Sequence, residues 1–170
     1  MTKPFKQIAV VGTGTLGAQI AMLASNAGYD VTIFDRQTGA FDAMMEKLHS
    51  ELTAKQGEPF IPFDQWPACR QQIKKVEKLD EAVKDADLVI EAVFESVEIK
   101  ADVTAKTEAV VPETCVFASN TSTLPITGLA KAAERPDQFI GLHFFSPVDK
   151  MPLVEVILGE QTNEETIARS

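Results

Sequence analysis

Residues 8–28, IAVVGTGTLGAQIAMLASNAG, carry the clearest structural signal in the chain. Four apolar residues run straight into a GxGxxG pattern, and a segment rich in Ala, Leu and Met follows. This order predicts a buried strand, a tight turn and a helix. Gly12 permits the turn, Gly14 lets the backbone approach a pyrophosphate, and Gly17 lets the helix pack close to the strand. The free N–H groups of the first helical turn then form a site for phosphate.

A second apolar run, residues 31–34, ends in Asp35, which lies 18 residues beyond Gly17. A carboxylate at this point of a dinucleotide-binding unit accepts hydrogen bonds from both ribose hydroxyls and repels a 2′-phosphate. We therefore predict that the chain binds NAD in preference to NADP, although the neighbouring Arg36 leaves NADP open. A GxGxxG pattern alone is weak evidence, and the flanking strand, helix and carboxylate argue against glycines that serve only a tight turn.

Composition excludes several classes of protein. The chain has 170 residues, of which 45% are apolar, and this suits one folded domain with its own core. A net charge of −9 argues against nucleic-acid binding, because phosphates favour basic surfaces. No apolar run reaches the roughly 18 residues that span a membrane, and no signal peptide precedes the first strand, so we expect a cytoplasmic protein. Cys69 and Cys115 lack metal-site or disulfide spacing and are interpreted as small hydrophobic residues.

Strand and helix patterns alternate along the rest of the chain. Helices are expected over residues 41–55, 64–72, 96–110 and 125–133, and strands over 73–77, 88–93, 116–118, 139–144 and 153–158. This alternation predicts an α/β fold of the Rossmann type over residues 1–158. The sheet would be doubly wound and mainly parallel, with a helical excursion after the second strand and the ligand at the carboxyl ends of the strands. Residues 159–170 are expected to form a linker or the start of a further helical domain.

Polar side chains gather where the strand ends should converge. Glu95 and Lys100 follow the strand at residues 88–93, and we expect them to face the nicotinamide end of a dinucleotide. The alternative is an ordinary loop acid and a helix lysine. Residues 119–122, a run of short hydrogen-bonding side chains, either cap a helix or bind a substrate oxygen and the cofactor amide.

His143 and Glu155 form the sharpest candidate pair. His143 lies in GLHFFSP, and Glu155 stands 12 residues later in the apolar segment LVEVI. A carboxylate on a core strand is costly to bury without a hydrogen-bonded partner, and His143 is placed to be that partner. If the two strands are neighbours, Glu155 fixes the imidazole tautomer and favours its protonated form. The other ring nitrogen is then a general base for an alcohol proton, while a structural histidine in a buried pair is the alternative.

Together these segments resemble the NAD-binding domain of the L-3-hydroxyacyl-CoA dehydrogenases. The similarity covers nearly the whole chain, through GTGTLGAQIA, IEAVFESVEIK, ASNTST and GLHFFSPVDKMPLVEVI. It implies oxidation of the 3-hydroxyl of an acyl-CoA to a 3-keto group with NAD, in fatty-acid metabolism. The resemblance implies a catalytic pair of His143 and Glu155, a substrate contact at Ser122, and cofactor contacts at Gly12, Gly14, Gly17, Asp35, Glu95, Lys100, Ser122 and Ser146.

The chain departs from the family pattern in two respects. Ser146 replaces the asparagine that precedes the proline in single-domain members, where it helps to position NAD, and this resembles the multifunctional fatty-acid oxidation proteins. The family also continues into a helical C-terminal domain that closes over the acyl chain, makes the homodimer and contributes an active-site asparagine. That domain is absent from the chain. By the same resemblance, residues 41–72 correspond to a helical excursion that contacts coenzyme A in the family, and we expect Lys47 or Lys55 to face its phosphates.

Three other functions stay open at this point. The chain could be an NAD-binding module that cannot turn over substrate because the C-terminal domain is missing. It could be a dehydrogenase of related fold for a small hydroxy acid, but that group generally uses a lysine as its acid/base, and Glu155 opposite His143 argues against it. A structural role, known among relatives of the family, is the third.

Overall fold

The structure, a computed structural model, describes residues 4–55, 59–148, 150–151 and 153–170. In these residues seven strands form one sheet in the order β3-β2-β1-β4-β5-β6-β7. The strands are β1 (Gln7–Val11), β2 (Asp30–Phe34), β3 (Lys74–Val76), β4 (Leu88–Glu91), β5 (Val116–Ser119), β6 (Phe139–Phe144) and β7 (Val154–Leu158). All neighbouring strands are parallel except β7, which pairs antiparallel with β6. The predicted Rossmann-type sheet is confirmed.

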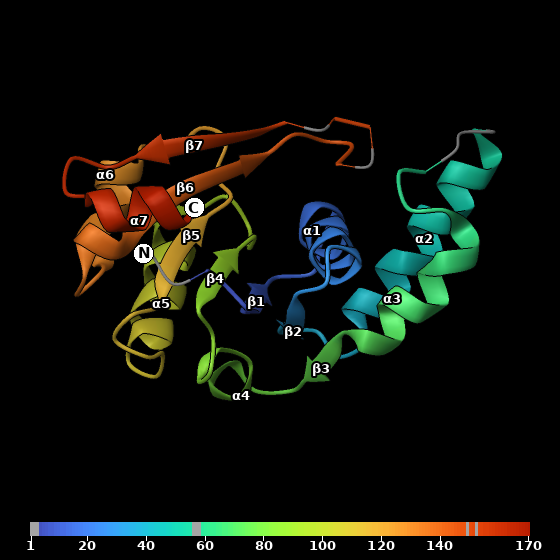
Figure 1. Ribbon diagram of the computed structural model, residues 1–170, viewed down its shortest axis with the longest axis horizontal. Helices are drawn as coiled ribbons and strands as arrows, with labels where there is room; N and C mark the ends of the chain where they lie inside the picture. The colour runs from blue at the N-terminus through green and yellow to red at the C-terminus, as the bar shows by residue number, and fades with distance from the viewer. Residues whose placement is uncertain (1–3, 56–58, 149, 152) are drawn as a thin grey trace.

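Helices cover both faces of this sheet (Figure 1). They are α1 (Thr15–Asn26), α2 (Ala40–Ala54), α3 (Trp66–Gln72), α4 (Leu79–Val83), α5 (Val97–Glu108), α6 (Ile126–Leu129) and α7 (Glu164–Arg169). Ile8 and Val10 of β1 belong to a core with side chains of α1, α2 and α3. Ala9 and Val11 point the other way, into a core with α4 and α6. A strand buried on both faces explains why the segment IAVV is continuously apolar.

The turn after β1 needs its glycines for steric reasons. Gly12 has φ +91° and donates its N–H to the carbonyl of Phe34 at 2.9 Å, and a Cβ there would lie 2.7 Å from the carbonyl oxygen of Ala92. A Cβ on Gly17 would lie only 1.9 Å from the carbonyl oxygen of Gly12. The backbone of α1 therefore approaches the turn so closely that no side chain fits between them.

The predicted helical excursion after the second strand is formed by α2 and α3, which lie side by side at one end of the molecule (Figure 1). A short 3₁₀ turn, Phe63–Gln65, leads into α3. The Trp66 indole N–H donates to the carbonyl of Ile61 at 2.9 Å, which ties the proline-rich segment to the body. Part of the segment between the helices lies outside the described residues.

The prediction that residues 153–158 form a buried strand is wrong. Val154, Val156 and Leu158 are all exposed, and so is Glu155. The reason is topological: β7 is the outermost strand of the described sheet and pairs only with β6. An apolar sequence thus indicated a strand correctly but did not indicate where in the sheet it lies.

Residues 159–170, predicted as a linker or the beginning of a helical domain, contain α7. Asn163 caps this helix by accepting the N–H of Thr166 at 2.8 Å. Thr166 is buried and donates its hydroxyl to the carbonyl of Asp137 at 3.0 Å. Helix α7 therefore packs on the Rossmann body, and its continuation into a further domain stays a prediction.

Candidate functional site

The turn from β1 into α1 leaves the start of the helix open. Gly14 precedes the helix in extended conformation, and a Cβ placed on it would meet no other atom within 4 Å. The first N–H groups of an α-helix have no acceptor within the helix, and no side chain caps this one. Space beside Gly14 and free donors behind it are what a pyrophosphate needs, so these residues fit a dinucleotide.

Asp35 lies directly beyond β2 and is tied to the same turn. Its carboxylate accepts the backbone N–H of Thr13 at 2.7 Å and the Thr13 hydroxyl at 3.0 Å, and it also accepts the N–H of Gln37 at 2.9 Å. A cavity of about 280 Å³ opens beside it, between the loop after β2 and the end of β3. The position suits the ribose and base of a nucleotide whose pyrophosphate lies at α1.

Lys100 does not reach open space. Its side chain is 2% exposed, and its ammonium lies 2.7 Å from Glu91 Oε1 and 3.4 Å from Glu95 Oε2. Glu91 is completely buried at the end of β4, where it also accepts the Ser119 hydroxyl at 2.7 Å and the Val93 N–H at 2.8 Å. The ammonium is therefore enclosed by carboxylates, and a direct contact between Lys100 and a cofactor stays a prediction.

Glu91 is a residue of the site region that the sequence reasoning missed. The available signal was an acid that ends the apolar strand LVIE, nine residues before a lysine on the next helix. A carboxylate buried without a cation would be too costly, so its presence on a core strand already required a basic partner.

Glu95 joins the loop after β4 to the turn after β5. Its Oε1 accepts the hydroxyl of Thr121, the N–H of Ser122 at 3.2 Å and both the N–H and the hydroxyl of Thr123. Partial burial would raise the pKa of Glu95, but the hydrogen bond from Thr121 and the charge of Lys100 outweigh it and hold the pKa below its ordinary value. The carboxylate is thus ionised and fixed, and the exposed Ser122 is held beside it.

His143 and Glu155 meet as predicted. They are directly opposite each other in the β6–β7 register, and His143 Nδ1 lies 2.9 Å from Glu155 Oε2. The histidine side chain is 16% exposed and the glutamate side chain 52%. The premise that Glu155 is buried is therefore wrong, because β7 is an edge strand. The pairing itself directs Nδ1–H toward the carboxylate, which leaves Nε2 as the nitrogen able to accept a proton.

Asn120 connects the two polar groups, and its role was not predicted. It is buried, and its side-chain oxygen accepts the backbone N–H of Phe144 at 2.9 Å. This bond fixes the turn that holds Glu95 and Ser122 against the end of β6, beside His143. Glu95, Ser122 and His143 thus lie at the carboxyl ends of β4, β5 and β6.

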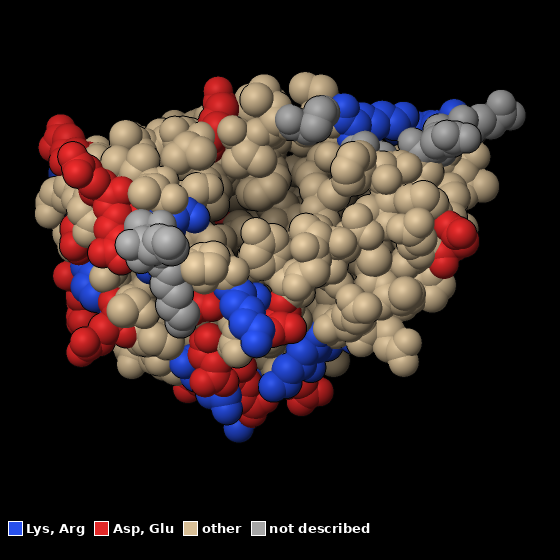
Figure 2. All heavy atoms as spheres, in the orientation of Figure 1, with Lys and Arg blue, Asp and Glu red and all other residues tan. Residues whose placement is uncertain are grey.

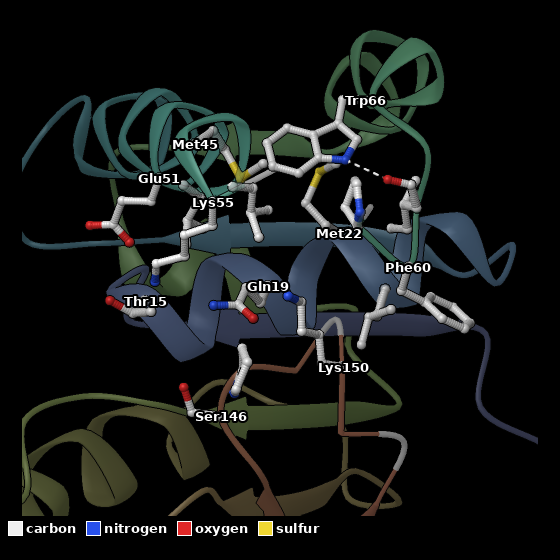
Figure 3. A pocket seen from close by; sticks show the side chains of 16 residues that line it. Thr15, Gln19, Met22, Met45, Glu51, Lys55, Phe60, Trp66, Ser146 and Lys150 are labelled. Carbon is white, nitrogen blue, oxygen red and sulfur yellow. Dashed lines mark hydrogen bonds between the residues drawn. The ribbon is translucent and has the colours of Figure 1, made fainter. Parts of the chain in front are cut away.

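Ser146 lines a separate cavity of about 270 Å³ between α1, α2 and the segment that follows β6 (Figure 3). Its walls are mainly apolar, and the charged residues that line it in the described part of the chain are Glu51, Lys55 and Lys150. Lys47 does not line the cavity and instead lies 3.9 Å from Glu51 on the surface of α2. Of the two lysines proposed from the sequence, Lys55 is the one that faces an enclosed space. Figure 2 shows that the molecule is hollowed near the middle of the face drawn there, where few charged side chains lie.

Neither cysteine has the properties of a reactive thiol. Both are buried, and burial raises the pKa of the Cys115 thiol to about 12 and that of Cys69 above its ordinary value. No group of three potential metal ligands occurs among the described residues. Within the same residues, no helix is long and apolar enough to cross a membrane.

The comparison with protein families decides the assignment. The model of the 3-hydroxyacyl-CoA dehydrogenase NAD-binding domain matches residues 7–170. The chain belongs to this family. The resemblance read from the sequence is therefore confirmed, and the glycine turn, Asp35 and the β6–β7 pair lie within the matched residues.

The proteins most readily compared with this chain are longer than it is. Fatty acid oxidation complex subunit alpha of Acinetobacter baylyi is 42% identical over 97% of this chain, which is 23% of that protein. The solved (S)-3-hydroxybutyryl-CoA dehydrogenase of Ralstonia eutropha is 33% identical, with a TM-score of 0.83 over 96% of this chain and 58% of that one. The dehydrogenase part of multifunctional enzyme 1 of C. elegans, at 24% identity and a TM-score of 0.88, shares the fold. The chain thus spans about a quarter of the curated relative.

Proposed function

We propose that this chain is the NAD-binding part of an enzyme that oxidises the 3-hydroxyl of a 3-hydroxyacyl-CoA to a 3-keto group. The observation that carries the proposal is the pair of His143 and Glu155, 2.9 Å apart at the carboxyl edge of the sheet. Family membership and the relatives with this activity in their names support it.

The cofactor half of the site is the turn at Gly12 and Gly14, the start of α1 and the carboxylate of Asp35. The turn and the helix would hold the pyrophosphate, and Asp35 would accept hydrogen bonds from the ribose hydroxyls in place of those it now accepts from Thr13. When bound, NAD supplies the acceptor for the hydride that leaves C3 of the substrate. Glu95 accepts the N–H of Ser122 and so holds the turn after β5 close to where the nicotinamide would lie.

His143 performs the proton transfer in this proposal. Its Nε2 accepts the proton of the 3-hydroxyl as the C3 hydrogen leaves with its electron pair, and Glu155 stabilises the resulting imidazolium through Nδ1–H. The exposed hydroxyl of Ser122 donates a hydrogen bond to the C3 oxygen. General-base action of this kind contributes about 10² to 10⁴ in rate.

The substrate half of the proposal rests on the apolar cavity beneath α2. Lys55 and Lys150 lie where an anionic group such as a coenzyme A phosphate would be attracted, and the apolar walls suit an uncharged chain (Figure 3). The partner of the site is then an acyl-CoA, and the homodimer of the complete protein would be made by segments outside this chain.

The first test replaces the proposed base in the full-length protein. His143→Gln should lower acetoacetyl-CoA reduction at least about 10²-fold, because no other group replaces Nε2, while NADH affinity stays within about twofold. His49→Gln is the matched control, since His49 lies against Phe63 and Trp66 on the excursion. Turnover that survives His143→Gln would refute the mechanism.

A nucleotide-binding module without turnover is the second candidate for this 170-residue chain alone. The observation that favours it is the exposure of Glu155 and of β7, which leaves one side of the catalytic pair open to water. NADH titration and acetoacetyl-CoA reduction on the same sample separate the two. Binding without reduction supports the module, and reduction by the chain alone supports a complete site.

A further inference from the structure

The cavity beside Asp35 has an uneven balance of charge. The carboxylates of Asp35, Asp42 and Glu77 line it. Lys75 is the one basic side chain among the described residues that do so. If the proposed function holds, this cavity receives the adenosine end of the cofactor, where NAD and NADP differ by a 2′-phosphate.

The single lysine is not free to meet a phosphate. Its ammonium lies 2.8 Å from one oxygen of Asp42 and 3.0 Å from the other, so it is engaged by both. The same carboxylate receives the guanidinium of Arg70 at 3.0 Å. The hydrogen bond from Lys75 has the largest effect on the pKa of Asp42. Burial acts in the opposite direction, but together with the bond from Arg70 the lysine holds this pKa below its ordinary value. Asp42 is thus ionised at neutral pH.

The position of Asp42 follows from the fold. It lies in the first turn of α2, directly after the loop that leaves Asp35, where a carboxylate is favoured by the helix dipole. Lys75 comes from β3, which pairs with β2. The pair therefore joins the excursion to the sheet edge beside the cavity that both residues line, and the ammonium is held by the Asp42 carboxylate.

We propose that Asp42 is a specificity-determining residue: by engaging Lys75, it withholds from a 2′-phosphate the one cation that lines the cavity among the described residues, since Arg36 does not line it. Asp35 discriminates by repulsion and by accepting the ribose hydroxyls, whereas Asp42 discriminates by occupying the only cation present among the described lining residues. The selectivity for NAD then has two separable sources.

The test measures NADH and NADPH dissociation constants by fluorescence titration of the chain. Asp42→Asn should strengthen NADPH binding about fivefold, as expected for an exposed ammonium released to a phosphate, with NADH affinity within about twofold. The same two dissociation constants are also measured with Asp35→Ser present. This change removes the carboxylate that repels a 2′-phosphate, so NADPH binding stays in a measurable range. Circular dichroism checks that each variant is folded.

Further variants test whether the gain in NADPH affinity comes from Lys75 or from the change in net charge. Lys75→Met alone should leave the selectivity unchanged, because the ammonium is already engaged, and Asp42→Asn with Lys75→Met should abolish the gain. Asp102→Asn removes a carboxylate from a similar exposed pair on α5, with Lys106 at 2.7 Å, and controls for net charge.

The outcomes are distinct. An NADPH gain that persists without Lys75, or that Asp102→Asn reproduces, overturns the inference. So does unchanged NADPH affinity in Asp42→Asn when NADH binding is intact. Failure of the unaltered chain to bind NADH would overturn the proposed function and this inference together.

Discussion

Two acid–base pairs lie at the carboxyl ends of the strands, and they differ mainly in their contact with water. Glu91 and Lys100 are 2.7 Å apart with side chains 0% and 2% exposed. His143 and Glu155 are 2.9 Å apart with side chains 16% and 52% exposed. Similar geometry thus suits two different purposes: the enclosed pair holds the loops of the site together, and the open pair is the one to which our proposal gives the proton transfer.

The buried pair tolerates its burial because its hydrogen bonds are numerous. Glu91 accepts from Lys100, Ser119 and the Val93 N–H, and these bonds join β4, β5 and α5. Removing two charges from water is costly, and the cost is offset only when every lone pair is used. The open pair needs no such network, since water solvates Glu155. The comparison teaches that the two pairs differ in burial and hardly at all in the distance between acid and base.

The largest effect is expected on breaking the buried pair. Lys100→Met leaves Glu91 charged and enclosed, which should lower the free energy of unfolding by about 3–5 kcal/mol in urea denaturation. Lys106→Met is the matched control, because it breaks an exposed pair of the same length and should cost less than about 0.5 kcal/mol. A loss below about 1 kcal/mol for Lys100→Met would contradict the structural role.

A smaller effect concerns Glu95, which is intermediate between the two pairs. Its pKa is lowered on folding, so its contribution to stability is present above the unfolded value and is lost as the pH falls through the folded value. Its side chain is 36% exposed, so we expect less than about 1 kcal/mol. In urea denaturation, Glu95→Gln should be less stable than the unaltered chain at pH 7 and should approach it near pH 3.

A variant of Thr121 provides the control for this pH dependence. Thr121→Val removes one donor to Glu95 and should reduce the same pH-dependent difference. A difference between Glu95→Gln and the unaltered chain that grows toward acid pH would have the wrong sign.

The smallest change in stability is expected for the open pair. Glu155→Gln should alter the free energy of unfolding by less than about 0.5 kcal/mol, because the carboxylate is half exposed. His143 should nevertheless lose its preference for the Nδ1–H tautomer, because a glutamine amide can donate to Nδ1 as well as accept from it, and ¹⁵N NMR of the ring nitrogens reports this with His49 as the internal reference. Destabilisation above about 1 kcal/mol would contradict this and would show that the pair stabilises the fold as Glu91 and Lys100 do.

Much of the fold was predictable because its signals are local. The glycine turn, the apolar strands and the helical excursion each depend on a few neighbouring residues. His143 and Glu155 were paired on the premise that an acid in an apolar strand is buried and needs a partner; the pair forms, although the premise is wrong. The burial of Lys100 and the exposure of Glu155 were not predictable in this way. The burial of Lys100 depends on how α5 packs against Glu91 at the end of β4. The exposure of Glu155 depends on the place of β7 in the sheet, and a sequence pattern does not state whether a strand has one neighbour or two.

The antiparallel arrangement of β6 and β7 has a consequence for protein engineering. Because the histidine and its acid are cross-strand neighbours, backbone hydrogen bonds of the sheet set their spacing, and the length of the connecting segment does not. The connection can therefore be exchanged or lengthened in an engineered variant without separating the two groups. Deleting Val156, in contrast, would shift the acid by one position if the end of β7 kept its register, which turns it to the opposite face and puts Val154 opposite His143.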